Sequence, residues 1–174
     1  MTAPDGSLAT APMKRSGGVR ESHEVVEPAP VQALAALFDD GLGTPGIGDP
    51  LPPLWHWAAL PSWPAAGLMG RHGHPTVGGF MPDTGLPRRM FAGGRVVLHA
   101  AVPVGATVRR TDEVVSVTRK EGRSGRLVIV VVETRIHVPT PSGGEVLAIT
   151  EQQDIVYREA RDPEASRPAL LPQP

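Results

Sequence analysis

The stretch RLVIVVVETRIHV, residues 126–138, decides how this chain folds. The run from Leu127 to Val132 is entirely apolar and mostly β-branched, which favours a β-strand over a helix. An unbroken apolar run of this length predicts a central strand covered on both faces, or a strand in a dimer interface. We therefore expect residues 126–138 to lie in the middle of a sheet.

Three further β-rich stretches surround this one: MFAGGRVVLHAAV (90–102), TVRRTDEVVSVTRK (107–120) and EVLAITEQQDIVYRE (145–159). Their mixture of apolar and polar residues suits strands with a single buried face. The segments between the four stretches, VPVGA, EGRSG and PTPSGG, are typical of turns. The sequence therefore predicts four long antiparallel strands.

The chain before these strands is expected to form a short strand and a helix. SHEVVE (22–27) suits the strand, and PVQALAALFDD (30–40) suits the helix. Pro30 fits a first helical position, and Gly41 is expected to end the helix. One helix face carries the apolar residues that recur at helical spacing: Val31, Leu34, Leu37 and Phe38.

A second, short helix is expected over LWHWAALPSW (54–63), after two prolines and limited by Pro61. This helix is too apolar to face water, and a long antiparallel sheet needs a cover on one face. Both needs are met if the sheet wraps around the helix. The predicted fold class is therefore α+β, with residues 71–87 as a long loop.

The length of 174 residues suits one domain, which we place at 19–160. Residues 1–18 and 161–174 are expected to form a disordered N-terminal arm and a disordered C-terminal tail. The first stretch is rich in small residues, and the last has many prolines and no hydrophobic period.

Composition excludes several classes of protein. The absence of cysteine excludes disulfides, thiolate zinc sites and a cysteine nucleophile, and it fits the cytoplasm. A net charge of -1 offers no basic field for nucleic acid or anionic lipid. No apolar run approaches the roughly 18 residues that cross a bilayer, and the N-terminus lacks the apolar core of a signal peptide.

Four segments together resemble a known family. PLPPLWHW (50–57), LPRRMFAGG (86–94), RKEGRSGRLVIVVVE (119–133) and EQQDIVYRE (151–159) are similar to the N-terminal half of MaoC-like hydratases of the 3-methylfumaryl-CoA hydratase type. The similarity runs from about Gly18 to about Glu159 and keeps the order of the segments.

The resemblance implies a single hotdog fold, in which a curled antiparallel sheet wraps around a central helix. It also implies that two hotdog units pair, as a homodimer or as a heterodimer with a catalytic subunit. The substrate would be an acyl thioester of coenzyme A or acyl carrier protein, held between the units, and no further cofactor is expected. In two-hotdog relatives the C-terminal half carries the chemistry, and this chain resembles the other half.

The hydratase motif of this family is only partly present. MaoC-type hydratases share Gly-Asp-x-Asn-Pro-(Ile/Leu)-His, in which the Asp and His enter one pocket. Gly48 and Asp49 match its start, but Leu54 stands at the histidine position and His56 comes two residues later. The chain has no asparagine. Asp49 and His56 are therefore candidate catalytic residues; alternatively, Asp49 stabilises a turn and His56 packs inside the sheet.

His72 and His74 are the next catalytic candidates, because glycines around them would let the loop reach a pocket. The alternative is that both are exposed loop residues. Their spacing does not predict a metal site, since no cysteine or carboxylate lies near them in the sequence.

Several residues are candidates for substrate binding. Arg88 and Arg89 are adjacent on a strand, so one would face solvent or a carrier phosphate and the other would face the acyl tunnel. Gly93 and Gly94 would permit a bulge or the close approach of a thioester, with backbone N–H groups as oxyanion donors. The remaining candidates lie beside these residues or beside His56: Met90, Trp55 and Trp57. The alternative for the two tryptophans is that they pack in the core, because a helix wrapped by a sheet needs bulky side chains.

Three functions remain open from the sequence. The first is a hydratase or dehydratase that acts alone or with a catalytic hotdog partner. The second is a non-catalytic subunit that binds the acyl chain. The third is a hotdog used for another reaction, such as that of a thioesterase or a cyclase.

Overall fold

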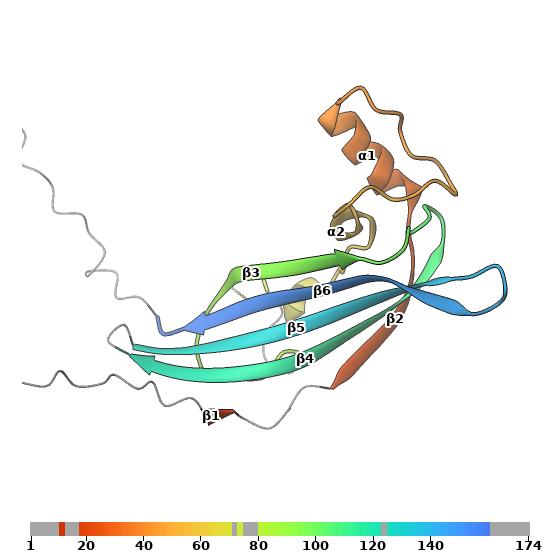
Figure 1. Cartoon of the computed structure of the whole chain (residues 1–174). Coiled ribbons are helices and arrows are strands. Elements are labelled where there is room, and N and C mark those ends of the chain that lie inside the picture. The colour runs from red at the N-terminus through yellow and green to blue at the C-terminus, as the bar shows by residue number, and fades with distance from the viewer. Residues whose placement is uncertain (1–10, 13–17, 71–72, 75–79, 123–124, 161–174) are drawn as a thin grey trace, which may run out of the picture.

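The computed structural model describes residues 11–12, 18–70, 73–74, 80–122 and 125–160, and one antiparallel sheet dominates it (Figure 1). The strands follow the order β1-β4-β5-β6-β3, and β2 also pairs with β4. All four predicted long strands are present, and β2 corresponds to the predicted SHEVVE strand. Their bounds are β1 Ala11–Pro12, β2 Val19–Val25, β3 Arg88–Leu98, β4 Thr107–Gly122, β5 Gly125–Pro139 and β6 Glu145–Arg158.

The central position predicted for β5 is confirmed, because β4 and β6 pair with it on either side. Its side chains alternate: Val128 and Val130 are buried, whereas Ile129 and Val131 between them are only half-buried. Within the described residues β5 is therefore fully covered on one face, not on both. The alternative, that the outer face of β5 meets another subunit, stays a prediction.

Two apolar clusters hold the inner face of the sheet. The larger contains Val26, Val31, Ala59, Leu60, Val102, Val104, Val108, Ile136, Val138, Ala148 and Ile149. The smaller contains Val114, Val117, Val128, Val130 and Ile155, with Phe80, Met81 and Leu86 of the loop before β3 packed against it. A row of polar residues lies between the two clusters. It consists of Asp112 on β4, Thr134 on β5 and Glu151 on β6, which are direct cross-strand neighbours.

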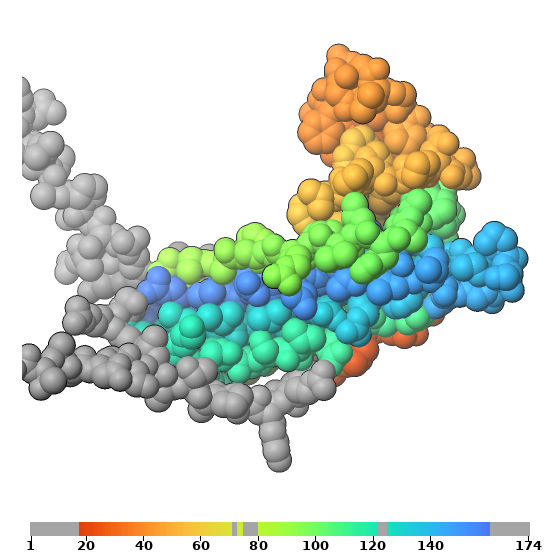
Figure 2. All heavy atoms as spheres, viewed as in Figure 1, coloured from red at the N-terminus to blue at the C-terminus, as the bar shows by residue number. Residues whose placement is uncertain are grey.

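Helix α1, Pro28–Phe38, starts earlier and ends earlier than predicted. Asp39, not Gly41, ends it: Asp39 has the left-handed φ of 44°, and its N–H donates to the carbonyl of Ala35. Of the predicted apolar face only Val31 is fully buried, while Leu37 and Phe38 are exposed. Figure 2 shows the reason, since α1 and the loop after it stand away from the sheet rather than against it.

The second predicted helix is a single turn, α2 His56–Ala59, followed by a 3-10 turn at Ala66–Leu68. Leu60 donates its N–H to the carbonyl of His56, and Pro61 has no N–H with which to continue. Ala59 and Leu60 belong to the larger apolar cluster, so this segment does pack on the inner face of the sheet. The predicted α+β hotdog fold with a curled antiparallel sheet is confirmed, with α2 as a shorter central helix than expected.

Other predictions concern the ends of the chain and the membrane. Strand β1 lies within the predicted arm, whereas residues 1–10 and 13–17 and the predicted tail at 161–174 lie outside the described residues. The helices in the described ranges are all too short, or not apolar enough, to cross a bilayer.

Candidate active site

A buried histidine–carboxylate pair lies on the inner face of the sheet. His56 of α2 is 4% exposed, and its Nε2 lies 3.3 Å from Oε2 of Glu151 on β6, which is also buried. An ionised carboxylate only accepts hydrogen bonds, so in the neutral imidazole of His56 Nε2 is the donor to Glu151 and Nδ1 is the acceptor nitrogen. His56 Nδ1 is buried and has no hydrogen-bond partner among the described residues.

Glu151 is held in place by two further donors. Trp57 Nε1 lies 3.0 Å from Glu151 Oε1, and Gln153 Nε2 lies 2.6 Å from the same oxygen. Burial has the largest effect on the pKa of Glu151 and raises it, but the hydrogen bonds from His56, Gln153 and Trp57 together outweigh burial and lower that pKa. Glu151 is therefore ionised at neutral pH and can orient the His56 imidazole.

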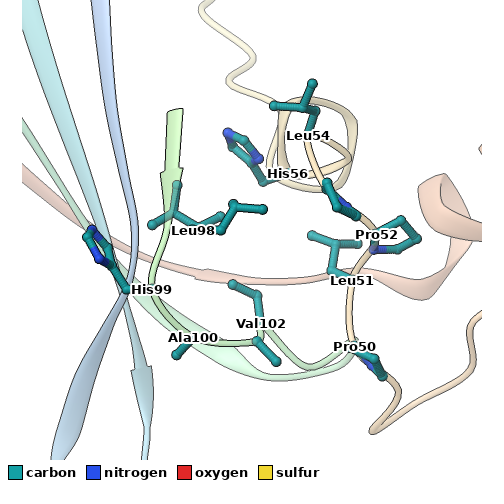
Figure 3. Close-up of a pocket in the computed structure, with 12 residues that line it drawn as sticks. Pro50, Leu51, Pro52, Leu54, His56, Leu98, His99, Ala100 and Val102 are labelled. Atoms are coloured by element: carbon teal, nitrogen blue, oxygen red, sulfur yellow. The ribbon is translucent and has the colours of Figure 1, made fainter. Parts of the chain in front are cut away.

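A pocket of about 340 Å³ opens beside His56 (Figure 3). Residues 50–54 form one side of it, residues 98–102 form the other, and Ile149 of β6 also contributes. Apart from His56 and His99, its wall consists of apolar side chains. A histidine that lines an apolar pocket can move a proton to or from a molecule bound there.

A second buried carboxylate, Asp112, lies on the same face. Its Oδ2 accepts from Arg20 Nε at 3.0 Å and from Arg20 Nη2 at 2.7 Å. Its Oδ1 accepts from Arg110 Nε at 3.2 Å and from Thr134 Oγ1 at 2.5 Å. These groups border a second pocket of about 460 Å³, to which Gln153 also contributes. Glu151 therefore contacts one residue of each pocket. It contacts His56, which lines the first pocket, and Gln153, which lines the second.

The predicted pair of Asp49 and His56 is not assembled. Asp49 is exposed, and its Oδ2 accepts from the N–H of Gly46 at 2.9 Å. The Asp49 carbonyl accepts from the N–H of Val104, which belongs to the larger apolar cluster. This hydrogen bond holds the turn next to that cluster. No hydrogen bond or ion pair joins Asp49 to His56 in the described ranges, so the structure agrees with the alternative in which Asp49 stabilises a turn.

The structure places only one of the two loop histidines. His74 is exposed, and its carbonyl accepts from the N–H of Gly70 at 2.7 Å. His72 lies outside the described residues. Within the described ranges no three histidine, aspartate or glutamate side chains lie close enough together to hold a metal ion.

The two tryptophans beside His56 have different environments. Trp55 packs against the larger apolar cluster, with its ring 5.8 Å from that of Phe38. Trp57 is 56% exposed, yet its indole N–H reaches the buried Glu151. Trp57 thus supports the histidine–carboxylate pair, and whether either ring contacts substrate stays a prediction.

Arg88 and Arg89 point to opposite faces, as their adjacent positions predicted. Arg89 is the cross-strand neighbour of Tyr157, and both line the second pocket. Arg88 lies on the outer face with Met90, and its Nη2 is 3.8 Å from Met90 Sδ. Only Arg89 of these three candidates therefore lines a pocket on the inner face.

A bulge is present directly before these two glycines, because the register of β3 on β6 shifts between Phe91 and Gly93 and leaves Ala92 unpaired. A Cβ atom on Gly94 would lie 2.9 Å from the backbone oxygen of Gln152, whereas one on Gly93 would have no neighbour nearer than 3.9 Å. Close packing of β3 against β6 thus accounts for Gly94. The oxyanion role of these N–H groups stays a prediction.

Sequence reasoning did not select the residues that surround His56 and the second pocket. These are Glu151, Gln153, Asp112, Thr134 and Arg20. One signal was present: on β6 the polar residues Glu151 and Gln153 interrupt an apolar face that continues at Ile149 and Ile155. A polar pair on a buried strand face marks a site or a buried network.

Comparison with known sequences gives two matches. The sequence model of the family described as hydroxyacyl-thioester dehydratase type 2 matches residues 54–174. Mesaconyl-C(4)-CoA hydratase of Chloroflexus aurantiacus is 44% identical over 142 residues, which cover 80% of this chain and 49% of the relative. The chain therefore spans about half the length of the curated relative that it matches.

Comparison with solved structures gives partial overlaps. HtdX of Mycobacterium tuberculosis has a TM-score of 0.45 at 18% identity, covering 80% of this chain and 51% of HtdX. The (R)-hydratase of A. caviae involved in PHA biosynthesis has a TM-score of 0.43 at 20% identity, covering 88% of this chain and 99% of the hydratase. The family of the chain follows from the sequence matches and not from these structural overlaps.

Proposed function

Because this chain belongs to the hydroxyacyl-thioester dehydratase type 2 family, we propose that it adds water to, or removes water from, an acyl thioester of coenzyme A or acyl carrier protein. The observation that carries this proposal is the buried His56, which is oriented by Glu151, has no hydrogen-bond partner on Nδ1 among the described residues, and lines a pocket. The relative named mesaconyl-C(4)-CoA hydratase supports coenzyme A as a carrier.

The chemistry requires a group that moves a proton at the α-carbon. In dehydration His56 Nδ1 takes the α-proton, and the C–H electron pair forms the double bond to the β-carbon. The β-hydroxyl leaves with a proton as water, and His56 can return its proton to that oxygen. Hydration follows the same steps in reverse. Glu151 fixes the His56 tautomer and stabilises the imidazolium that forms while the proton is held.

A second function is that of a non-catalytic subunit that holds the acyl chain for a catalytic hotdog partner. One observation favours it: Asp49 and His56 do not form the motif pair. No feature of the described residues favours the thioesterase or cyclase alternative. The cytoplasmic location and the expectation of no further cofactor stay predictions from the sequence.

In either case we propose that the chain works as a pair of hotdog units, as a homodimer or as a heterodimer. Exposed apolar side chains on α1 and the loop after it support an association surface. These residues are Leu37, Phe38, Leu42 and Ile47.

Activity of variants distinguishes the two functions. We expect His56→Gln to lower kcat for enoyl-CoA hydration by at least about 100-fold, or about 2.7 kcal/mol in barrier. His23→Gln, a histidine exposed on β2, is the matched control and should keep full activity. Assays should use the chain alone and the chain mixed with a hotdog subunit that has the complete motif.

The outcomes separate clearly. If the mixture is active and His56→Gln leaves its kcat unchanged, the chain is the non-catalytic subunit. If neither preparation hydrates enoyl-CoA or dehydrates hydroxyacyl-CoA, the hydratase proposal is wrong.

A further inference from the structure

The two buried carboxylates of the inner face differ in the charge of their partners. Asp112 accepts hydrogen bonds from Arg20 and Arg110, so two guanidinium groups compensate its negative charge. Glu151 has no arginine or lysine partner among the described residues. A buried carboxylate without a cationic partner costs free energy, so other donors must hold it.

Neutral donors occupy one oxygen of the Glu151 carboxylate. Trp57 and Gln153 both donate to Oε1, and His56 faces Oε2. Hydrogen bonds from neutral groups favour the ionised form of a carboxylate without cancelling its charge. The whole charge of Glu151 therefore remains available to stabilise an imidazolium at His56, and a cation in the place of Gln153 would weaken that effect.

The position of Trp57 is set by this hydrogen bond and not by burial of its ring. The residue is 56% exposed, although a tryptophan stabilises a fold mainly through the surface that it buries. Its N–H nevertheless reaches a carboxylate whose side chain is 5% exposed. Because Trp57 and His56 are adjacent on the single turn of α2, the same carboxylate holds both side chains.

His56 is the only titratable side chain bonded to Glu151 in the described part of the chain. On β5 and β3 the direct cross-strand neighbours of Glu151 are Thr134 and Val96, which carry no charge. Asp112 lies one strand further, on β4 beyond Thr134. The ionisation of Glu151 therefore depends on its burial and on the donors that its two oxygens accept.

We propose that Trp57 and Gln153 are positioning residues for proton transfer at His56: their neutral donors aim the Glu151 carboxylate at the imidazole and leave its charge uncompensated. The proposal rests on the hydration chemistry proposed above and adds two residues that act on His56 through Glu151.

Two variants of Gln153 separate the hydrogen bond from the charge. Gln153→Met removes the donor at similar size, and Gln153→Lys keeps a donor but adds a cation. Loss of the donor should raise the pKa of Glu151, whereas the added cation should lower that pKa further. Both variants should lower kcat for enoyl-CoA hydration by at least about ten-fold, because one misplaces the carboxylate and the other compensates its charge. A purely structural role of Gln153 would not move the pKa of Glu151 in opposite directions.

The indole N–H of Trp57 reports the ionisation of Glu151 in the full chain. Its proton resonance in an NMR spectrum of labelled protein should lie downfield while Glu151 is ionised and should move upfield as the pH falls. The step that disappears in Glu151→Gln belongs to Glu151. Trp63, which is 86% exposed, supplies the reference resonance of an indole in water.

The matched controls are Gln152→Met and Gln152→Lys. Gln152 is the adjacent residue of β6, and it faces the outer side of the sheet, where it donates to Glu133. These variants make the same changes of donor and charge, and they should leave kcat and the indole titration as in the wild type. Circular dichroism should show that all variants are folded.

Trp57 is tested by a second pair of variants. Trp57→Phe keeps an aromatic ring but removes the N–H, and it should lower kcat by at least about ten-fold. Trp63→Phe is the matched control and should keep the wild-type kcat.

The outcomes are distinct. A wild-type kcat in Gln153→Lys or in Trp57→Phe would overturn the proposal, and so would an unchanged pKa of Glu151 in Gln153→Met. If the wild-type chain has no activity, alone or with a hotdog partner, the hydration function fails. The indole titrations then still decide whether neutral donors hold Glu151, since they need no substrate.

Discussion

At the scale of single residues, the inner face of the sheet buries two carboxylates by surrounding each with donors. Asp112 accepts four hydrogen bonds and Glu151 accepts three. Burial acts to raise the pKa of each carboxyl, but the donors outweigh burial, so that the pKa of each lies below its ordinary value. A buried charge is tolerated in a protein when it is paired in this manner.

These lowered pKa values predict how stability depends on pH. Ordinary values are 3.8 for Asp112 and 4.5 for Glu151, and both are lower in the folded chain. Their contribution to the free energy of unfolding is therefore complete above about pH 4.5 and is lost as the pH falls through the folded pKa values. We expect the urea midpoint to be nearly constant between about pH 5 and 7 and to fall steadily below about pH 4.5.

The double variant Asp112→Asn/Glu151→Gln tests this assignment. It should be less stable at pH 7 and should lose less of its remaining stability on acidification than the wild type does. The linkage argument is wrong if the wild type and the double variant lose stability in parallel between pH 5 and 3.

At the scale of elements, the bulge in β3 determines how the edge strand meets the rest of the sheet. The register shifts between Phe91 and Gly93, and from Gly94 onward the strand pairs with residues 149–153 of β6. At Gly94 the backbone of β6 approaches so closely that a side chain has no room. The same strand carries Arg89 on the inner face, so its seating on β6 also positions the second pocket.

Substitution of the two glycines separates packing from backbone freedom. Gly94→Ala should lower the free energy of unfolding by about 2 kcal/mol, because its Cβ would lie 2.9 Å from the Gln152 oxygen and β3 would have to move. Gly93→Ala is the matched control and should change stability by less than about 0.5 kcal/mol, since its Cβ has ordinary contacts. Denaturant unfolding measures both, and equal losses would contradict this account.

At the scale of the whole molecule, α1 and its following loop project from the sheet (Figure 2). Several apolar side chains of this region are exposed. Leu37 is 76% exposed and Ile47 is 80% exposed. Such a surface is typical of an association site, and it agrees with the proposed pairing of two hotdog units. A partner there would bury side chains that the chain itself leaves in water.

We therefore expect the purified chain to sediment as a dimer, or as a heterodimer when a hotdog partner is present. Leu37→Glu should raise the dissociation constant by at least about ten-fold, because pairing would desolvate the added charge. Val19→Glu is the control, since Val19 is an exposed apolar residue at the start of β2, at the other end of that strand from α1. Unchanged sedimentation of Leu37→Glu would place the interface elsewhere.

By itself, the amino-acid sequence determined the four long strands, the strand before α1, the approximate position of α1 and the presence of a bulge beside Gly93. These features follow from local patterns: β-branched runs, Gly and Pro at turns, and helical spacing over about three turns. The opposite orientation of Arg88 and Arg89 also follows locally, because successive strand residues face opposite sides. His56 was a candidate from its sequence context, but its partner was not.

Only the tertiary structure decided the partners in the site. His56 meets Glu151 across 95 residues, and Arg20 meets Asp112 across 92. Strand register sets these meetings, and a slip of one residue would turn Glu151 and Asp112 to the outer face. The length of α2 was decided in the same manner, because its one turn is held by packing on the sheet rather than by helix propensity. The carboxylate partner of His56 therefore comes from β6 and not from Asp49 close by in the chain.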